Sequence, residues 1–574
     1  MRLGSAPLTC THTTDHPTIH TPVPHKEITM PLHNNHASLI NNTAPHIHDP
    51  AIVQDHDGSY AVFGTHRMFA HSDDLVHWSP LTNNLTRNPE AELGAIWEQW
   101  PASPTNPDLR GNTWAPDVIW NPTMHRWCMY LSLNGDDLRS VIVLLVAEEL
   151  TGDWTYVGPV VYSGFTGQDI ARTDANDVLR EAAATSSPMD AARILDVARY
   201  MSRKDTRINA IDAAPVLCED GTMWLAFGSW FAGIWMLRLD PATGLRDRSI
   251  RYPLIRDTTG NASVSDPYYG VKIAGGYWNS GEGAYLVQRD GWWFLMLSYG
   301  WLGRTGGYQV REFRARSPLG PFVDMHGNPA IALGETPHNE TGRTGVRMLS
   351  SVHWHDGSDA IEVSQGHNSV LQRNDGRMFL VYHTRFADRF HPDDDEDFDM
   401  RVRELVMTDN GWLAVSPALY RGEPMQPVDM ADIPGDYDII IHDPTTCFTG
   451  DTDDTGRREG VGIPQAITLQ ADGRIICGEA VAFSDTNGLT APRMTDGAPT
   501  CGSWRFAARA RPGLPEDDAG PVIGSAHAAS DIVMHLNGMP YHMRASAQPH
   551  DAAPARILLT GVGCNQAVWG VRRG

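Results

Sequence analysis

The sequence predicts an all-β protein: a five-bladed β-propeller with a helical insertion, followed by a small C-terminal β-barrel or β-sandwich domain. The first observation is length, because 574 residues are too many for one ordinary hydrophobic core. The second is the abundance of residues that form tight turns, with 53 glycines and 39 prolines. The third is a hairpin pattern that recurs along the chain. Together they indicate many short strands built from one repeated unit.

Each copy of this hairpin begins with an ionisable residue, continues through an apolar run and ends in Asp-Gly. Four copies begin with Asp49, Asp212, Glu282 and His367, and Asp-Gly follows each at the same offset. Asp-Gly between two apolar runs is a strong hairpin signal. A further copy has Ala115 in place of the ionisable residue. Five such units of about four strands each predict a propeller.

The sequence divides into an N-terminal arm, a propeller that contains an insertion, and a second domain. Residues 1–44 are polar and rich in His, Thr and Pro, and we expect a disordered or loosely attached arm. The propeller is expected over residues 45–425, with a tryptophan-rich loop around Trp97. Inside it, residues 170–206 have the Ala-, Leu- and Arg-rich composition and the spacing of helices. Residues 430–574 hold shorter β-like segments and are predicted to form the second domain.

Charge and hydropathy exclude some classes of partner. A net charge of −24 argues against nucleic acid or an anionic membrane, because either partner needs a basic surface. The charge is compatible with a neutral substrate such as a carbohydrate. We find no apolar run long enough to cross a membrane. The sequence carries no signal of oligomeric state.

Cysteine usage and the N-terminus bear on the compartment. The seven cysteines are dispersed without a C-x-x-C pair, which predicts free thiols in a reducing compartment. The N-terminus has no readable apolar core of a secretory signal, so a cytoplasmic protein is expected. Secretion is the alternative if the assigned start is wrong. Met30 is a candidate for the true start, because little before it looks foldable.

The repeat predicts a functional site. In a propeller the first strand of each blade lines the central channel, so Asp49, Asp212, Glu282 and His367 should converge at one end. Three crowded carboxyl groups raise the pKa of at least one of them. Glycoside hydrolysis needs such a set, a protonated acid and an ionised base. Any one of these acids alone would more simply be a turn or cap residue, but their recurrence in register favours catalysis.

His367 has two interpretations. A histidine in a propeller channel is more often structural. Beside three carboxylates it can also hold a cation, directly or through water. The residues leave both possibilities open.

At these residues the chain resembles glycoside hydrolase family 43, the five-bladed propeller arabinanases and β-xylosidases. The resemblance covers about residues 46–420 and is greatest to endo-α-1,5-L-arabinanases that carry a C-terminal β-barrel. The matching pieces are His48-Asp49-Pro50, Trp114 to Asp117, Ile211 to Pro215, Gly228 to Trp235, Gly281 to Tyr285, Gly366 to Ser369 and Tyr382 to Arg385.

The resemblance implies an enzyme that inverts the anomeric centre of arabinan or arabino-oligosaccharides. It implies that Asp49 is the general base, that Glu282 is the general acid and that Asp212 orients the acid and tunes its pKa. It places His367 beside a Ca²⁺ ion that is largely coordinated by water. It implies that the sugar subsites are lined by Trp114, Ser229 and Trp230, with Arg385 in support.

Two alternatives remain at this point. The nearer one is an exo-α-L-arabinofuranosidase or β-xylosidase of the same family, because the insertion at 170–206 and the long stretch 258–280 both lie near the expected substrate face. The other, of a different class, is a non-catalytic carbohydrate-binding propeller, against which the retention of all three acids argues.

Overall fold

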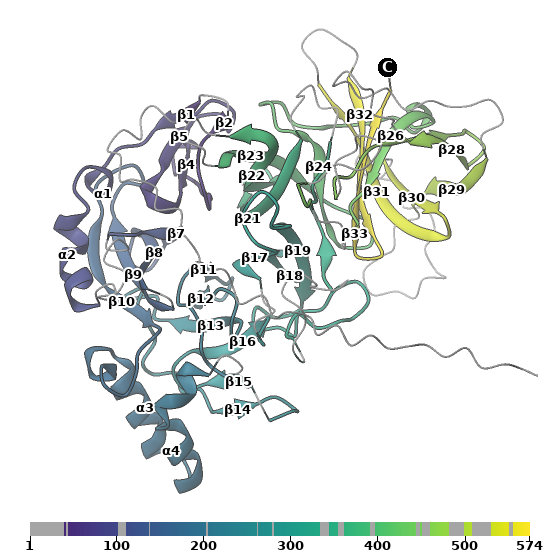
Figure 1. Ribbon diagram of the computed structural model, residues 1–574. Coiled ribbons are helices and arrows are strands. Elements are labelled where there is room, and N and C mark those ends of the chain that lie inside the picture. Colours follow the sequence, from purple (N-terminus) through teal and green to yellow (C-terminus); the bar gives the residue numbers. More distant parts are fainter. Residues whose placement is uncertain are drawn as a thin grey trace, which may run out of the picture. The chain divides into compact units, whose positions relative to one another are not determined.

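Five strands form a closed circle at the centre of the propeller (Figure 1). In the computed structural model β3 contacts β7, β7 contacts β11, β11 contacts β17, β17 contacts β21, and β21 returns to β3. These are the first strands of the predicted repeats, so the circle has the order of the chain. The structure describes residues 40–41, 44–100, 111–136, 138–202, 205–260, 262–277, 281–332, 334, 344–353, 361–390, 396–443, 448–450, 460–480, 499–507, 530–549 and 555–573.

Three blades are separate four-stranded antiparallel sheets. Their central strands are buried on both faces, because each blade is covered by its neighbours; in β9, for example, every residue from Val141 to Leu145 is buried. The strands are β3 (Ala51–Gln54), β4 (Tyr60–Phe63), β5 (Phe69–Ser72) and β6 (Ser79–Pro80); β7 (Trp114–Asn121), β8 (Arg126–Asp136), β9 (Arg139–Ala147) and β10 (Thr155–Tyr162); and β21 (Glu362–Gln372), β22 (Met378–Phe390), β23 (Glu396–Met407) and β24 (Leu413–Leu419).

The third blade is a larger, six-stranded sheet. Its strand order is β11 (Ala214–Leu217), β12 (Met223–Phe227), β13 (Ile234–Leu239), β16 (Gly270–Ala274), β15 (Ser263–Asp266) and β14 (Ile255–Arg256). The added strands come from the long stretch before Glu282. A separate short pair, β1 (Ile40–Asn41) and β2 (Ala44–Pro45), precedes the first blade.

The fourth blade differs from the expectation of five separate blades. It consists of β17 (Glu282–Arg289), β18 (Trp292–Tyr299), β19 (Gln309–Ala315) and β20 (Val346–Arg347). The two-residue β20 pairs in parallel with β33 of the C-terminal domain, so four blades are separate sheets and this one belongs to a 13-stranded sheet. A short outer strand leaves unpaired backbone groups at its edge, and β33 covers that edge.

The C-terminal domain is a closed eight-stranded barrel. Closure leaves no free strand edge, and the interior is filled by buried apolar residues such as Tyr437, Ile532 and Leu559. Its strands are β26 (Gly435–Ile441), β27 (Gln465–Leu469), β28 (Arg474–Ala480), β29 (Thr500–Phe506), β30 (Asp531–Leu536), β31 (Met539–Gln548), β32 (Arg556–Gly563) and β33 (Gln566–Arg572), and the short β25 (Gln426–Pro427) pairs with β31.

Helices occur where the sequence predicts them and in one further place. The insertion contains α3 (Ala175–Ala184) and α4 (Pro188–Ile194), flanked by short 3₁₀ helices at Ile170–Arg172 and Val197–Met201. The expectation of a loop around Trp97 was wrong, because α1 (Asn84–Arg87) and α2 (Glu90–Gln99) lie there. Leu93, Ile96 and Trp97 have helical spacing and bury one face of α2. Among the described residues no helix is long and apolar enough to span a membrane.

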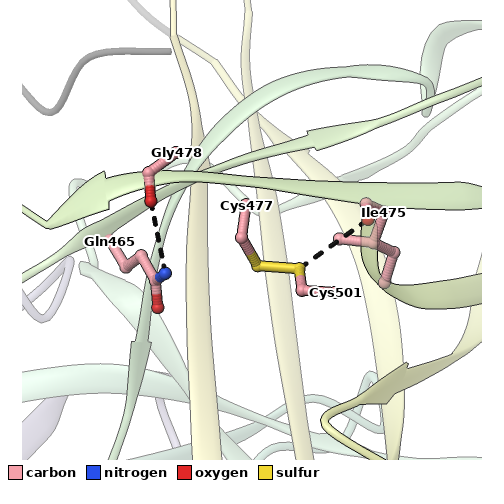
Figure 2. Close-up of a disulfide and its surroundings, with 5 residues drawn as sticks. All are labelled: Gln465, Ile475, Cys477, Gly478 and Cys501. Carbon is pink, nitrogen blue, oxygen red and sulfur yellow. Dashed lines mark hydrogen bonds between the residues drawn. A yellow bond between two sulfur atoms is a disulfide. The ribbon is translucent and has the colours of Figure 1, made fainter. Parts of the chain in front are cut away.

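The prediction of free thiols was wrong for two cysteines. Cys477 on β28 and Cys501 on β29 form a disulfide, with Cα atoms 5.7 Å apart (Figure 2). The two strands are neighbours in the barrel, so residues 24 positions apart in sequence meet directly. Cys128, Cys218 and Cys564 are free. Cys10 and Cys447 lie outside the described residues, as does nearly all of the predicted arm, 1–44.

Candidate active site

One residue in or just before each first strand has a left-handed backbone. The φ angles are 53° at Asp49, 37° at Ala115, 57° at Asp212, 57° at Gly283 and 48° at His367. Four of these residues carry a side chain, for which this conformation costs about 1–2 kcal/mol each. Strain at the same place in every blade identifies a shared ring at the mouth of the channel.

The left-handed positions show that Glu282 is not at the backbone position expected from the repeat. The equivalent residue of the fourth blade is Gly283, and Glu282 precedes it. β17 and β18 are joined by the two-residue turn Asp290-Gly291, whereas β11 and β12 are joined by a longer turn, and a β-bulge follows Glu282. A constant offset from Asp-Gly therefore gives a different backbone position in this blade.

Hydrogen bonds between blades fix the ring. Four ring N–H groups donate to a side chain of the preceding blade: Ala115 to Thr65 Oγ1 (2.8 Å), Asp212 to Ser132 Oγ (3.1 Å), His367 to Ser298 Oγ (2.6 Å) and Asp49 to His383 Nδ1 (3.3 Å). The third blade has Gly228 in the corresponding place, which offers no side chain. The N–H of Gly283 donates instead to Asp212 Oδ2 at 3.2 Å. Asp212 is thus tied to the residue that follows Glu282.

Asp49 is surrounded by imidazole nitrogens. Nδ1 of His48, His367 and His383 lie 2.8, 3.1 and 3.6 Å from its Oδ1, the first contact being short but bent. The hydroxyl of Thr65 donates to Oδ2. Burial alone would raise the pKa of Asp49, but His367 and the two other imidazoles hold that pKa well below its usual value. Asp49 is therefore ionised, as a general base must be.

Glu282 is held by three donors. Its Oε2 accepts from Ser229 Oγ at 2.9 Å and from Trp230 Nε1 at 3.0 Å, and its Oε1 accepts from Tyr308 Oη at 2.8 Å. The sequence does not single out Tyr308. The only local signal is Gly306-Gly307 before it, where a Cβ on Gly306 would lie 2.0 Å from the Trp301 carbonyl oxygen. This tight loop brings Tyr308 to the acid.

Asp212 has the opposite charge environment from Asp49. Burial raises the pKa of Asp212 to about 8, opposed in part by His367 and reinforced by the charges of Glu282 and Asp49. Asp212 thus holds a proton at neutral pH. Burial produces most of this effect and the crowding of carboxyl groups predicted from the repeat adds to it, so Asp49 is ionised and Asp212 is protonated.

The four predicted binding residues lie in different places. Ser229 and Trp230 are buried against Glu282, with 2% and 8% of their surface exposed. Trp114 is half-buried beside the ring residue Ala115. Arg385 is 3% exposed and lies behind Asp49, where it contacts His48 and His383. Contact of these side chains with a sugar stays a prediction.

The channel below the ring has donors suited to a cation. A small cavity there is lined by residues that include Asp117, His367 and Asn368. Burial raises the pKa of Asp117 to about 8, and Asn368 Oδ1 is buried without a hydrogen-bond partner in the described part of the chain. Oxygen atoms of this kind, completed by water, suit Ca²⁺. The residues therefore fit the ion that the family resemblance implies.

Comparison with known proteins identifies the family. The model of glycosyl hydrolases family 43 matches residues 197–413. An extracellular endo-α-(1→5)-L-arabinanase of Bacillus subtilis is 30% identical, the match spanning 69% of this chain and 76% of the relative. The chain belongs to glycosyl hydrolase family 43. A similar extracellular enzyme of Thermotoga petrophila is also 30% identical, over the same shares. The protein is therefore a glycosidase by family, with a carbohydrate substrate.

A solved structure shows the same fold in this family. The endo-1,5-α-L-arabinanase of Thermotoga petrophila superposes with a TM-score of 0.66 at 24% identity, covering 93% of this chain and 99% of the other. The match spans the propeller and the barrel together.

The predicted cytoplasmic location is contradicted. Both relatives are named extracellular enzymes. The disulfide between Cys477 and Cys501 agrees with them, because such bonds persist in oxidising compartments.

Proposed function

We propose that this family 43 protein is an inverting endo-α-1,5-L-arabinanase acting on arabinan or arabino-oligosaccharides. The relatives that match most of the chain carry that activity in their names. The observation that carries the mechanism is the contrast between Asp49, whose pKa is held well below its usual value, and Asp212, whose pKa burial raises to about 8.

Asp49 is assigned as the general base. Its Oδ1 is fixed by imidazoles and its Oδ2 by Thr65, so the carboxylate has one orientation. In an inverting reaction this carboxylate removes a proton from the water that attacks the anomeric carbon. The low pKa of Asp49 keeps it available as an acceptor across the neutral range.

Glu282 is assigned as the general acid. The indole N–H of Trp230 can only donate, so Oε2 of Glu282 is an acceptor and the acidic proton belongs on Oε1. The Tyr308 hydroxyl at Oε1 can rotate to accept that proton until the leaving sugar oxygen takes its place. Asp212 supports the acid through the N–H of Gly283, the residue that follows Glu282.

A cation in the channel would be held by His367, with Asp117, Asn368 and water completing its ligands. When bound, Ca²⁺ would supply positive charge beneath the carboxylates. Asp49 and Glu282 carry out the two proton transfers described above.

Product analysis tests the proposal. Linear α-1,5-L-arabinan and defined arabino-oligosaccharides are digested, and products are separated by size at early times. We expect a ladder of oligosaccharides, with β-arabinofuranose as the first-formed anomer by NMR. Release of monosaccharide alone would assign the exo alternative, and hydrolysis of nitrophenyl β-xyloside in place of arabinan would assign a β-xylosidase.

The Glu282→Gln variant tests the acid. Loss of general acid catalysis should lower kcat on arabino-oligosaccharides by about 10²–10⁴-fold. Unchanged hydrolysis by this variant would refute the assignment of Glu282.

A further inference from the structure

Arg385 lies between two stacked histidine rings behind Asp49. Its Nη2 is 3.3 Å from Nε2 of His48, and its Nη1 is 3.4 Å from Nε2 of His383. The two rings stack with centroids 4.0 Å apart and planes 22° apart. Arg385 is 3% exposed, so this cluster is a built part of the interior.

The chemistry of the guanidinium group settles the proton position on His48. Arginine has only donors, so Nε2 of His48 must accept the bond from Nη2. A ring that accepts at Nε2 is neutral and carries its proton on Nδ1. That Nδ1 lies 2.8 Å from Oδ1 of Asp49. This contact is short but bent, so the proton position set at Arg385 reaches Asp49 through a close electrostatic contact and not through an aligned hydrogen bond.

His383 is also neutral, but Arg385 does not fix which of its ring nitrogens carries the proton. Burial, together with the nearby cation of Arg385, holds the pKa of His383 well below its usual value. Donors face it on both sides, the N–H of Asp49 at Nδ1 and Arg385 at Nε2. A neutral imidazole can accept only one of these bonds. His48 is thus the ring whose proton position Arg385 determines.

The distances between the ligand atoms of this cluster are compatible with a metal site, but its hydrogen-bond partners are not. The ligand atoms of His48, Asp49 and His383 all lie within 4.8 Å of one another. Histidines that bind metals usually donate their second ring nitrogen to a carboxylate or carbonyl group. Here the second nitrogens of both rings face the cation of Arg385, which opposes metal binding. The geometry favours a fixed relay made of one hydrogen bond, from Arg385 to His48, and one close contact, from His48 to Asp49.

We propose that Arg385 is a positioning residue that holds His48 in its Nδ1–H tautomer and thereby orients Asp49 for its role as the base. The relay runs from Arg385 on β22 through His48 to Asp49 at the start of the first blade, and it closes the propeller between its last and first blades. The catalytic part of this inference rests on the proposed function, while the tautomer itself does not.

A double-mutant cycle tests the relay. Arg385→Met should lower kcat on arabino-oligosaccharides by about 10–100-fold, the effect of losing one hydrogen bond to a charged group, with KM within about twofold. In His48→Asn the amide NH₂ can donate to Asp49 without help from arginine, but an imidazole beside the base is lost, so kcat should fall and this variant serves only as the second background of the cycle. Adding Arg385→Met to His48→Asn should then change kcat by less than about twofold. Arg389→Met, on the same strand and paired with Asp399, is the matched control and should leave kcat unchanged.

Two outcomes overturn the relay through kinetics. A rise in KM at constant kcat in Arg385→Met would mean that the arginine binds the sugar directly. An equal loss of kcat in both backgrounds would mean that Arg385 acts independently of His48.

Two further measurements do not depend on arabinan hydrolysis. In ¹⁵N-histidine-labelled protein, the ring signals that disappear in His48→Asn should have the Nδ1–H pattern and should lose it in Arg385→Met. An Nε2–H pattern in the unsubstituted protein would refute the tautomer even if the enzyme hydrolyses arabinan. Stoichiometric zinc or another transition metal in purified protein, lost in His48→Asn, would also overturn the relay and assign a metal site.

Discussion

The hydroxyl of Tyr308 donates a 2.8 Å hydrogen bond to Oε1 of Glu282, and its ring stacks 5.7 Å from His383, which bonds the backbone of Asp49. One side chain thus connects the surroundings of the acid with those of the base. A Cβ on Gly366 would lie 2.1 Å from this ring, so the glycine before His367 is required for Tyr308 to reach the site.

Removal of the Tyr308 hydroxyl should impair the chemical step. Tyr308→Phe should lower kcat by about 10–100-fold, since the bond is made to a group that changes charge during the reaction. KM should change little, because the ring and its packing remain. Steady-state kinetics on arabino-oligosaccharides measure both. Tyr299→Phe, a buried tyrosine on β18, is the control, and a similar loss in that variant would show that the effect is general to the core.

The pKa of Asp212 predicts a pH dependence. A carboxyl group whose pKa is raised to about 8 stays protonated below that pH, so Asp212 ionises above it and adds a negative charge beside the acid. We expect kcat/KM to fall above about pH 8. Asp212→Asn removes this titrating carboxyl group, so the alkaline limb near pH 8 should be lost, with kcat reduced about 10²-fold. An alkaline limb at the same pH in this variant would contradict the assignment; the pH profile of kcat/KM decides.

The glycine in the ring should be intolerant of a side chain. A Cβ on Gly283 would approach the His367 ring to 3.1 Å, and its φ of 57° is unfavourable for alanine. Gly283→Ala should therefore displace the His367 imidazole and lower kcat/KM by about 10²-fold. Gly291→Ala is matched, because φ there is 74° but a Cβ would meet only the Arg316 guanidinium at 3.4 Å. Melting temperatures should fall in both variants, and equal activity in the two would contradict the steric argument.

The disulfide should stabilise the barrel. It closes a segment whose ends are 24 residues apart, and chain entropy predicts a loss of about 2–4 kcal/mol in the free energy of unfolding when Cys477 and Cys501 are both replaced by Ser. Urea denaturation of the double variant, with Cys564→Ser as the free-thiol control, measures it. Equal stability of the double variant and the unsubstituted protein would show that the bond has no such role.

The repeated hairpin was enough to predict the propeller. Hairpin signals and apolar runs are local, so the first strands around Asp49 and Asp212 can be read without knowledge of their partners. The same reasoning placed Glu282 one residue out of register, because a bulge and a shorter turn do not change the hydrophobic pattern. It also missed the helix around Trp97, whose apolar spacing is obscured by neighbouring tryptophans.

The sequence by itself determined the architecture and the three acids, because both follow from one pattern that recurs in register. Only the tertiary structure decided the surroundings of each acid. Asp49 meets His383 across 334 residues of chain, and Glu282 meets Tyr308 through a glycine-rich loop. The charge state of a carboxyl group depends on burial and on its nearest charges, and those neighbours come from other blades. The pairing of Cys477 with Cys501 was likewise decided by the adjacency of two barrel strands, for the same reason.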